Sequence, residues 1–452
     1  MRVRLWLLGV IFLFSLNLGV TEALGINTSL LRVAIEASMV LLLADALRRA
    51  SLDDLLHAFK GTALPMLATS IGVGAALLNH SNLLEVLLFL REMLVPLMYF
   101  AMFLLAPPDS REWKVLTTMI LIVFAIQLPV AALKYWTSGI NEKIWIGTFH
   151  QHAGQLGLLM PMLGVSFLWA YAIKRQRLLI PVTLATCFAM ISVVNEKRSI
   201  VLVMPALVLL IIGVDIVFTR MAQVKEKELW YLKPRAVAHI LLAFLASSSV
   251  TTVFALRSIP SFDVNTIDYN HIPSPSVPAY IQEYLTRDYD SPMNYSSANP
   301  SVDENRNIQL GRFRLWQLGV EECLALSRER CLFGAGGGWL LKHPMLTDKP
   351  VDFMFQQLHL RGPASTGFRH LFEIGAIGLL LMVVWIAQIG WDLIQRASDP
   401  RVGLLALGAT GAWGLLAFDY LLYSQVGWSA GVFLPVCFLV VAAALRNDRY
   451  AK

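Results

Sequence analysis

The stretch SIVLVMPALVLLIIGVDIVF at residues 199–218 decides what kind of fold this chain adopts. Its 20 residues include one charged side chain, Asp215. A helix of about 20 apolar residues spans the hydrocarbon core of a bilayer. Eleven further stretches share this character, so we expect an all-α polytopic membrane protein with about 12 transmembrane helices. Those eleven lie near residues 5–22, 30–47, 62–79, 83–106, 115–135, 153–173, 178–194, 236–256, 371–391, 402–422 and 428–445.

The composition of the whole chain agrees with a membrane protein. Of 452 residues, 56% are hydrophobic and 15% are charged, and the mean hydropathy is +0.60. Soluble globular chains are about 45–50% apolar and about 25% charged. These values exclude a disordered chain and a collagen-like repeat. The net charge of +6 would suit nucleic acid, but the positions of the positive charges explain it differently.

The distribution of the positive charges predicts which segments lie on the cytoplasmic side of the membrane. With the N-terminus in the cytoplasm, cytoplasmic segments hold 20 lysines and arginines, whereas the short outer loops hold four. Such an excess marks the cytoplasmic side of a membrane protein. We therefore expect a multi-pass protein of the bacterial inner membrane with both termini in the cytoplasm. Alternatively, residues 1–23 are a cleaved signal, because Arg2 and Arg4 precede an apolar stretch that ends near Ala23.

The topology predicts three regions. Residues 1–256 form transmembrane helices 1–9, residues 257–370 form a periplasmic loop domain, and residues 371–452 form transmembrane helices 10–12. A loop of 114 residues is usually functional or disordered. Its tyrosines suit stacking on sugars, and ordinary packing of a small cap explains them equally well.

The second half of this loop is more regular than the first. From Asn307 to about Glu329 the spacing predicts a helix, with Arg312 and Trp316 on one face. If that helix continued through Cys323 and Cys331, their Cα atoms would lie roughly 12 Å apart, too far for a disulfide, which allows about 7 Å. We therefore expect no bond between them.

A glycine-rich run, GAGGG at residues 334–338, follows this helix. It does not match a phosphate-binding loop. The glycines allow either a tight backbone path or the close approach of a ligand.

Several charges stand where apolar side chains are expected. Arg198, at the outer end of two helices, is either an anion clamp or an interfacial arginine whose head reaches the lipid headgroups. Arg32 and Glu36 are four apart and can pair on one helix face. A second charged group contains Glu85, Arg91 and Glu92, and Asp419 and Tyr420 lie near the outer end of the eleventh helix. Ionisable residues inside a membrane often serve function.

Five segments together resemble one family, the O-antigen ligases and O-antigen polymerases of bacterial envelopes. They are, in order, GTFHQHA at 147–153, EKRS at 196–199, GRFRLW at 311–316, LFGAG at 332–336 and EIGAIGL at 373–379. The resemblance covers roughly residues 140–390. At the position of the ligases' His-Asn pair, nine residues before the glutamate of ExGxxGL, this chain has Ala364, with His359 and His370 on either side.

The resemblance implies an enzyme that moves a glycan from undecaprenyl diphosphate to an acceptor hydroxyl on the periplasmic side. The acceptor is a growing glycan or the lipid A core. Cations are needed on the leaving diphosphate, where negative charge accumulates, and Arg198 and Arg312 suit that role. A base takes the acceptor proton, and His370, His359 and Glu373 are the candidates for it.

Trp316 and Gly336 are the expected contacts to sugar or lipid. The loop has no acidic cluster with metal-ligand spacing, so we expect no required metal or other cofactor, and no nucleic-acid partner. Two other functions remain open, a multi-span transporter and an assembly partner in polysaccharide export. An enzyme would have an outer-facing site, whereas a transporter would have a midplane site between two similar halves.

Overall fold

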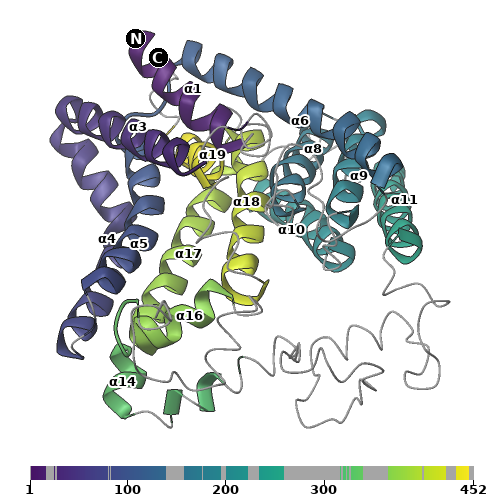
Figure 1. Cartoon of the computed structure of the whole chain (residues 1–452). Coiled ribbons are helices and arrows are strands. Elements are labelled where there is room, and N and C mark those ends of the chain that lie inside the picture. Colours follow the sequence, from purple (N-terminus) through teal and green to yellow (C-terminus); the bar gives the residue numbers. More distant parts are fainter. Residues whose placement is uncertain are drawn as a thin grey trace.

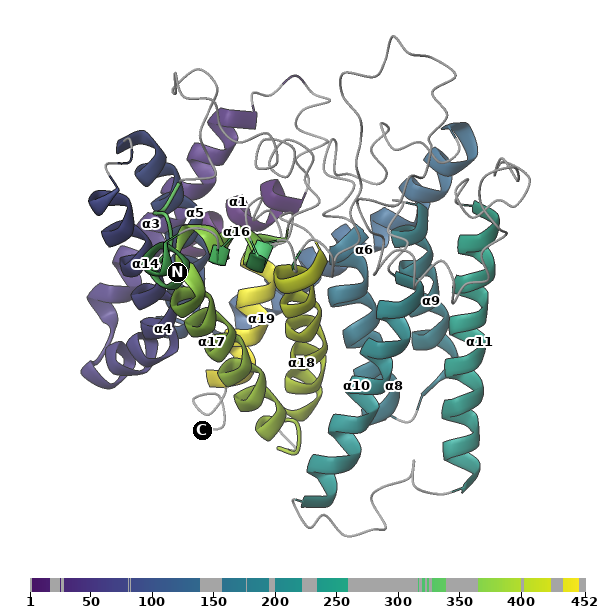
Figure 2. The same ribbon diagram turned by 90° about the horizontal axis from the view of Figure 1, so that it is seen from below.

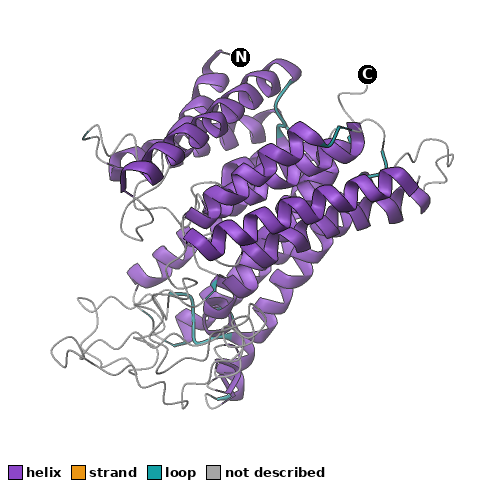
Figure 3. Cartoon of the chain, turned by 90° about the vertical axis from the view of Figure 1, so that its right-hand side faces the viewer, coloured by secondary structure: helices purple, strands orange, loops and turns teal. Residues whose placement is uncertain are grey.

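The computed structural model describes a helical protein. It describes residues 2–16, 25, 28–79, 81, 83–138, 157–175, 177–194, 200–221, 234–258, 316, 319–321, 323–324, 327–338, 365–399, 402–423 and 434–446. All regular structure in these residues is helical, and none of it is strand (Figure 3). The expected all-α fold is confirmed for this part of the chain.

The helices follow the apolar stretches of the sequence (Figure 1). Each of the twelve expected segments overlaps a helix. The elements are α1 (Arg2–Leu16), α3 (Thr28–Arg49), α4 (Leu52–Leu78), α5 (Leu83–Leu105), α6 (Ser110–Ser138), η1 (Met160–Val165), α8 (Ser166–Arg175), α9 (Leu179–Val194), α10 (Ile200–Met221), α11 (Pro234–Ser258), α14 (Arg328–Phe333), α16 (Thr366–Glu373), α17 (Gly375–Arg396), α18 (Gly403–Phe418), η7 (Asp419–Tyr423) and α19 (Leu434–Arg446).

Seven of these helical stretches are long and apolar enough to cross a membrane. They are Leu52–Leu78, Leu83–Leu105, Ser110–Lys134, Gly157–Arg175, Ala236–Ala255, Gly375–Arg396 and Gly403–Leu422. Shorter apolar helices occur at Val3–Leu13, Leu179–Val193, Val203–Val217 and Leu434–Arg446. The chain is thus a helical membrane protein, while the number of twelve crossings and the side of each end stay predictions.

Helix α4 begins ten residues before the expected segment at 62–79. Ser51 caps it, because its hydroxyl accepts from the backbone N–H of Asp54 at 3.2 Å. In return, the Asp54 carboxylate accepts from the backbone N–H of Ser51 at 3.1 Å. Such reciprocal capping starts a helix independently of hydropathy, which explains the earlier start.

The helices form three adjacent groups (Figures 1 and 2). Helices α17, α18 and α19 lie in the middle, with α3, α4 and α5 on one side and α8 to α11 on the other. Two tryptophans of the middle group form hydrogen bonds to neighbouring helices. Trp385 donates its indole N–H to the carbonyl oxygen of Gly61 at 2.7 Å, and Trp413 donates to that of Ile386 at 2.8 Å.

Basic side chains tie the helices together at one end of the bundle. Arg446 of α19 contacts the Asp54 carboxylate and the carbonyl oxygen of Leu104, at the end of α5. Arg4 of α1 donates to the carbonyl oxygens of Ala106 at 2.6 Å and Pro107 at 3.2 Å. These arginines belong to segments that the charge distribution predicts to be cytoplasmic.

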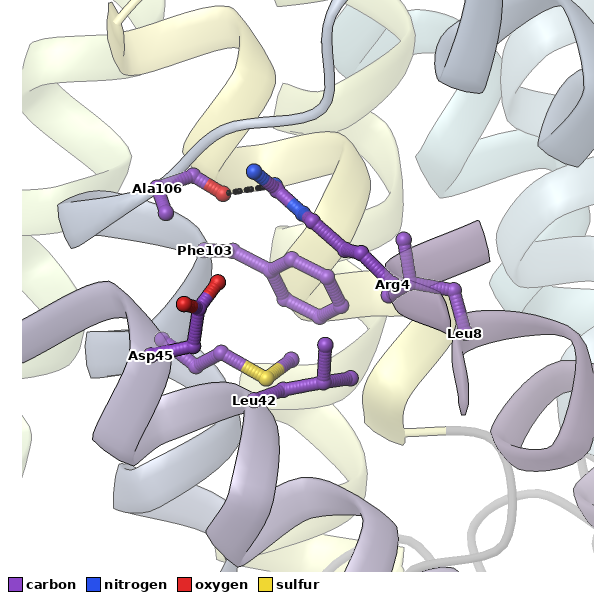
Figure 4. A pocket seen from close by; sticks show the side chains of 7 residues that line it. Arg4, Leu8, Leu42, Asp45, Phe103 and Ala106 are labelled. Carbon is purple, nitrogen blue, oxygen red and sulfur yellow. Dashed lines mark hydrogen bonds between the residues drawn. The ribbon is translucent and has the colours of Figure 1, made fainter. Parts of the chain in front are cut away.

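A small pocket lies at this end between α1, α3 and α5 (Figure 4). Leu8, Leu42 and Phe103 give it apolar walls, and Arg4 and Asp45 reach it from two helices. Arg4 is also 3.4 Å from the Glu112 carboxylate. Its guanidinium therefore anchors α1 to the connection between α5 and α6 and to the start of α6.

Glu36, which the spacing predicts can pair with Arg32, makes a contact between helices. Arg91 of α5 donates its Nε–H to Glu36 of α3 at 3.1 Å. The side chain of Arg32 lies outside the described residues.

Candidate functional site

The far end of the bundle holds a segment that returns into it from the long loop. Described residues of this segment are helical at Trp316, at 319–321 and at 323–324. Ser327 then starts α14 anew, because its hydroxyl accepts from the backbone N–H of Arg330 at 3.3 Å. The chain changes direction at Ser327 and does not continue as one helix.

This break overturns the expectation for the cysteines. Cys323 and Cys331 form a disulfide, with their Cα atoms 5.0 Å apart. The expectation assumed one uninterrupted helix through both residues, which would have separated them by roughly 12 Å. The new helix start at Ser327 brings them together.

The glycine run after α14 follows a tight path between helices. The backbone N–H of Ala335 donates to the carbonyl oxygen of Phe372 at 2.7 Å, and that of Gly337 donates to Gly72 of α4 at 2.8 Å. Gly336 has φ +118°, and a Cβ there would lie 2.5 Å from the Cα of Ala76. The structure contains the tight backbone path, and the close approach of a ligand to these glycines stays a prediction.

Helix α16 is short, and all eight of its residues are buried. Ser365 caps its N-terminus by accepting from the backbone N–H of Phe368 at 3.2 Å. After Glu373 the chain turns sharply at Gly375, which has φ +71°. A Cβ at Gly375 would collide with the carbonyl oxygen of Leu332. The expected helix at 371–391 is therefore two helices, and α17 begins only at Gly375.

An ion pair fixes α16 against α5. Arg369 donates from its two terminal nitrogens to the two carboxylate oxygens of Glu92, at 2.9 and 2.8 Å. The same guanidinium lies 3.5 Å from Glu373. Because Glu92 is nine residues into α5, this pair lies roughly 13 Å below the end of that helix. Charges at such depth are costly unless paired, and the two parallel bonds provide the pairing.

A second contact fixes α16 against the end of α18. His370 Nδ1 is 2.7 Å from the Tyr420 hydroxyl oxygen, and both side chains are almost fully buried. Tyr420 belongs to η7, a π-helical turn. Such turns disturb the regular pattern of backbone hydrogen bonds and often occur at functional sites.

Two further side chains bind the same turn. The Trp316 indole N–H donates to the carbonyl oxygen of Leu421 at 2.8 Å, and the Ser365 hydroxyl donates to that oxygen at 2.7 Å. The Trp316 ring also meets Phe368 edge to face, with centroids 5.7 Å apart. The start of α16 is therefore held on η7 from several directions.

One face of α16 carries polar atoms without a hydrogen-bond partner among the described residues. They are Thr366 Oγ1 and His370 Nε2, and beside them lies the Glu373 carboxylate, whose Oε1 is 3.5 Å from Arg369, too far for a well-formed hydrogen bond. Residues 366, 370 and 373 are spaced by four and three, so they share a helix face. A buried polar atom without a partner costs about 1–3 kcal/mol. Such atoms gathered on one face are typical of a site that receives a ligand or water.

The environment of this face sets its charges. Burial and the neighbouring Arg369 guanidinium lower the pKa of His370 to about 3, so its imidazole is neutral. Burial raises the pKa of the Glu373 carboxyl, against the lowering effect of the Arg369 guanidinium and with a further rise from Glu92. A general base must be able to take up a proton at the working pH. The lowered pKa makes His370 a weak base, whereas the raised pKa makes Glu373 a stronger one than an exposed glutamate.

The structure brings some of the predicted site residues together. His370 and Glu373 lie on the same face of α16, Trp316 packs on that helix, and Gly336 packs on α4. Arg198, Arg312 and His359 lie outside the described residues. The roles of all seven stay predictions, and no group of three potential metal ligands occurs within the described part of the chain.

Sequence reasoning singled out Tyr420 near the outer end of the eleventh helix, but it missed Arg369 and Thr366 at this face. An arginine at 369 and a glutamate at 373 are spaced for pairing on a helix, which was an available signal. Glu92 stood out as an intramembrane charge, but its partner lies too far along the chain to be identified from spacing. No protein-family model matches this sequence, and no curated protein does so either.

Proposed function

We propose that this protein is a glycan transferase of the O-antigen ligase or polymerase type. It moves a glycan from undecaprenyl diphosphate to an acceptor hydroxyl at the periplasmic face of the bacterial inner membrane. The observation that carries this proposal is the buried face of α16, where the Glu373 carboxylate, 3.5 Å from Arg369, lies beside Thr366 Oγ1 and His370 Nε2, which have no hydrogen-bond partner among the described residues. The ExGxxGL segment that resembles the family begins at this same glutamate.

The proposed reaction assigns a role to this carboxylate. Glu373 takes the proton of the acceptor hydroxyl while that oxygen forms a bond to the anomeric carbon. The bond from that carbon to the diphosphate oxygen breaks, and undecaprenyl diphosphate leaves with the electron pair. Arg198 and Arg312 are the proposed cations on the leaving group, where charge develops.

The periplasmic side is supported by the disulfide of Cys323 and Cys331. Disulfides persist in oxidising compartments and are rare in the cytosol. The bond belongs to the loop that the charge distribution predicts to be outside, so two independent features agree on the orientation.

Deletion of the gene and profiling of envelope glycans tests the proposal. Short single repeat units would indicate a polymerase, and long polymer kept on its lipid with uncapped lipid A core would indicate a ligase. Complementation with Glu373→Gln should fail, whereas Glu36→Gln, at the exposed pair with Arg91, should restore the wild-type profile. An unchanged glycan profile in the deletion strain would refute the proposal.

The buried ion pairs also suit a second function, a transporter coupled to protons. Buried carboxylates inside membrane proteins often relay protons, and Glu92 and Glu373 flank the buried Arg369 inside the bundle. Proton uptake by vesicles that contain the purified protein, driven by a solute gradient and abolished by Glu373→Gln, would favour that function over transfer.

A further inference from the structure

Tyr420 and His370 are close enough to form a hydrogen bond. Which of the two donates it determines whether the other ring nitrogen of His370 can donate or accept. The Tyr420 hydroxyl oxygen lies 2.7 Å from Nδ1, and the two rings meet with centroids 5.5 Å apart. Which ring nitrogen of a neutral histidine carries the proton is set by the hydrogen bond that the other nitrogen makes. This contact therefore controls the state of Nε2, which faces the polar side of α16.

General acid–base chemistry favours one direction of this bond. A phenol O–H is a stronger acid than the N–H of a neutral imidazole, because the phenol has a pKa near 10. The imidazole nitrogen is also a stronger base than the phenol oxygen. Donation from the phenol to Nδ1 is thus preferred over donation in reverse, and a neutral imidazole that accepts at Nδ1 has its proton on Nε2.

We propose that Tyr420 is a positioning residue that donates to Nδ1 of His370, so that His370 offers its Nε2–H to a substrate oxygen. His370 is then a hydrogen-bond donor and leaves the role of base to Glu373. This inference rests on the proposed function for the identity of the substrate, whereas the state of the imidazole is a property of the protein alone.

The local architecture supports a positioning role. The carbonyl oxygen of Leu421, next to Tyr420, accepts from both Trp316 and Ser365. A Cβ at Gly367 would lie 3.0 Å from the carbonyl oxygen of Tyr420, so the turn and α16 are in close contact. These links hold the phenol and the imidazole at a fixed separation. Burial and the Arg369 guanidinium, which lower the pKa of His370, also favour the neutral ring that this bond requires.

The same face holds groups that complement an N–H donor. Glu373 follows His370 by three residues and Thr366 precedes it by four, so all three lie on one side of α16. A substrate hydroxyl can accept from the Nε2–H of His370 and donate to the carboxylate of Glu373. One donor and one acceptor then orient the oxygen whose proton Glu373 removes.

Nitrogen NMR of the full chain in lipid bilayers tests the state of His370 without any substrate. The protein is labelled with ¹⁵N-histidine, and the His370 signals among the nine histidines are assigned by their loss in His370→Gln. The proposal expects a protonated Nε2 and an unprotonated Nδ1 in the wild type. A protonated Nδ1 with an unprotonated Nε2 would overturn it.

Tyr420→Phe removes only the hydroxyl and should change the tautomer signal of His370. Tyr99→Phe removes the hydroxyl of another buried tyrosine, on α5, and should leave that signal unchanged. An identical His370 signal in the wild type and in Tyr420→Phe would contradict the positioning role. If Tyr420→Phe does not fold, the wild-type spectrum alone still decides the direction of the bond.

Substitutions at His370 separate a donor from a base in the transfer assay. Loss of a hydrogen-bond donor in an active site typically lowers the rate by about 100-fold or more, which we expect for His370→Ala. The side-chain amide of glutamine can donate a hydrogen bond but cannot take a proton, so His370→Gln should recover part of this loss. Equal loss in both variants would contradict the donor role. If the wild type transfers no glycan, the proposed function fails, and the NMR result still stands.

Discussion

Arg369 and Glu92 are 277 positions apart in the chain, yet they meet through two parallel hydrogen bonds of 2.9 and 2.8 Å. This pair joins the returning segment of the long loop to the side of α5. It places His370 and Glu373 inside the bundle, because both lie on the same short helix as Arg369.

Glu92→Gln should destabilise the protein by about 3 kcal/mol, because it leaves the buried guanidinium of Arg369 without its main partner. Chemical denaturation in lipid bicelles measures this change. Asp45→Asn is the matched control, since Asp45 pairs with arginines that are largely exposed. Exposed pairs contribute about 1 kcal/mol or less. Equal effects of the two substitutions would contradict a structural role for the buried pair.

Gly375→Ala should also destabilise the fold, by about 1–3 kcal/mol for the backbone angle alone. Its φ of +71° is unfavourable for other residues, and a Cβ would meet the carbonyl oxygen of Leu332. Gly74→Ala on α4 is the control, because no atom lies within 4 Å of a Cβ built there. Alanine is favoured over glycine in helices by about 1 kcal/mol, so thermal melting in detergent should show opposite signs for the two variants.

The stability difference between Glu373→Gln and the wild type should depend on pH. Because burial raises the pKa of Glu373 above its ordinary value, the native state holds this proton more tightly than the unfolded state does. The stability from this proton is fully present below the unfolded pKa of about 4.3 and is lost as the pH rises through the higher native pKa. Relative to the wild type, the variant should therefore gain stability across this window, by at most about 1.4 kcal/mol per pH unit.

For His370→Gln, the stability difference from the wild type should depend on pH in the opposite direction. Burial lowers the pKa of His370 from 6.5 to about 3, so the unfolded state binds this proton more readily than the native state does. The wild type should lose stability relative to this variant as the pH falls from 6.5 towards 3. Melting temperatures of the two proteins measured from pH 4 to pH 8 check this prediction, and a constant difference would contradict it.

The disulfide of Cys323 and Cys331 should appear as a linked peptide in a non-reducing digest, with a mass change on reduction. Replacing both cysteines by serine should lower stability by about 2–3 kcal/mol, as a closed loop of this length predicts. The peptide with the free thiol of Cys437 should give no such mass change. Unlinked thiols at residues 323 and 331 in protein taken from intact cells would contradict both the bond and the oxidising side.

The sequence by itself determined the class of the protein and the position of its helices. The length and apolarity of a segment decide whether it can form a membrane helix, and both are local properties. Each of the twelve apolar segments accordingly overlaps a helix. The errors at the helix starts came from local features outside hydropathy, namely the cap at Ser51 and the turn at Gly375.

The tertiary structure alone decided how the candidate site is built. The motif at 373–379 drew attention to Glu373, and His370 stood out as a neighbouring titratable group. The partners of this helix face, Glu92 and Tyr420, come from α5 and η7. The relative placement of the helices determines such contacts. The apolar pattern of a segment shows that it forms a membrane helix but does not show which polar groups of other helices it meets. The disulfide is a similar case, because the chain direction at Ser327 decides whether two cysteines eight residues apart can meet.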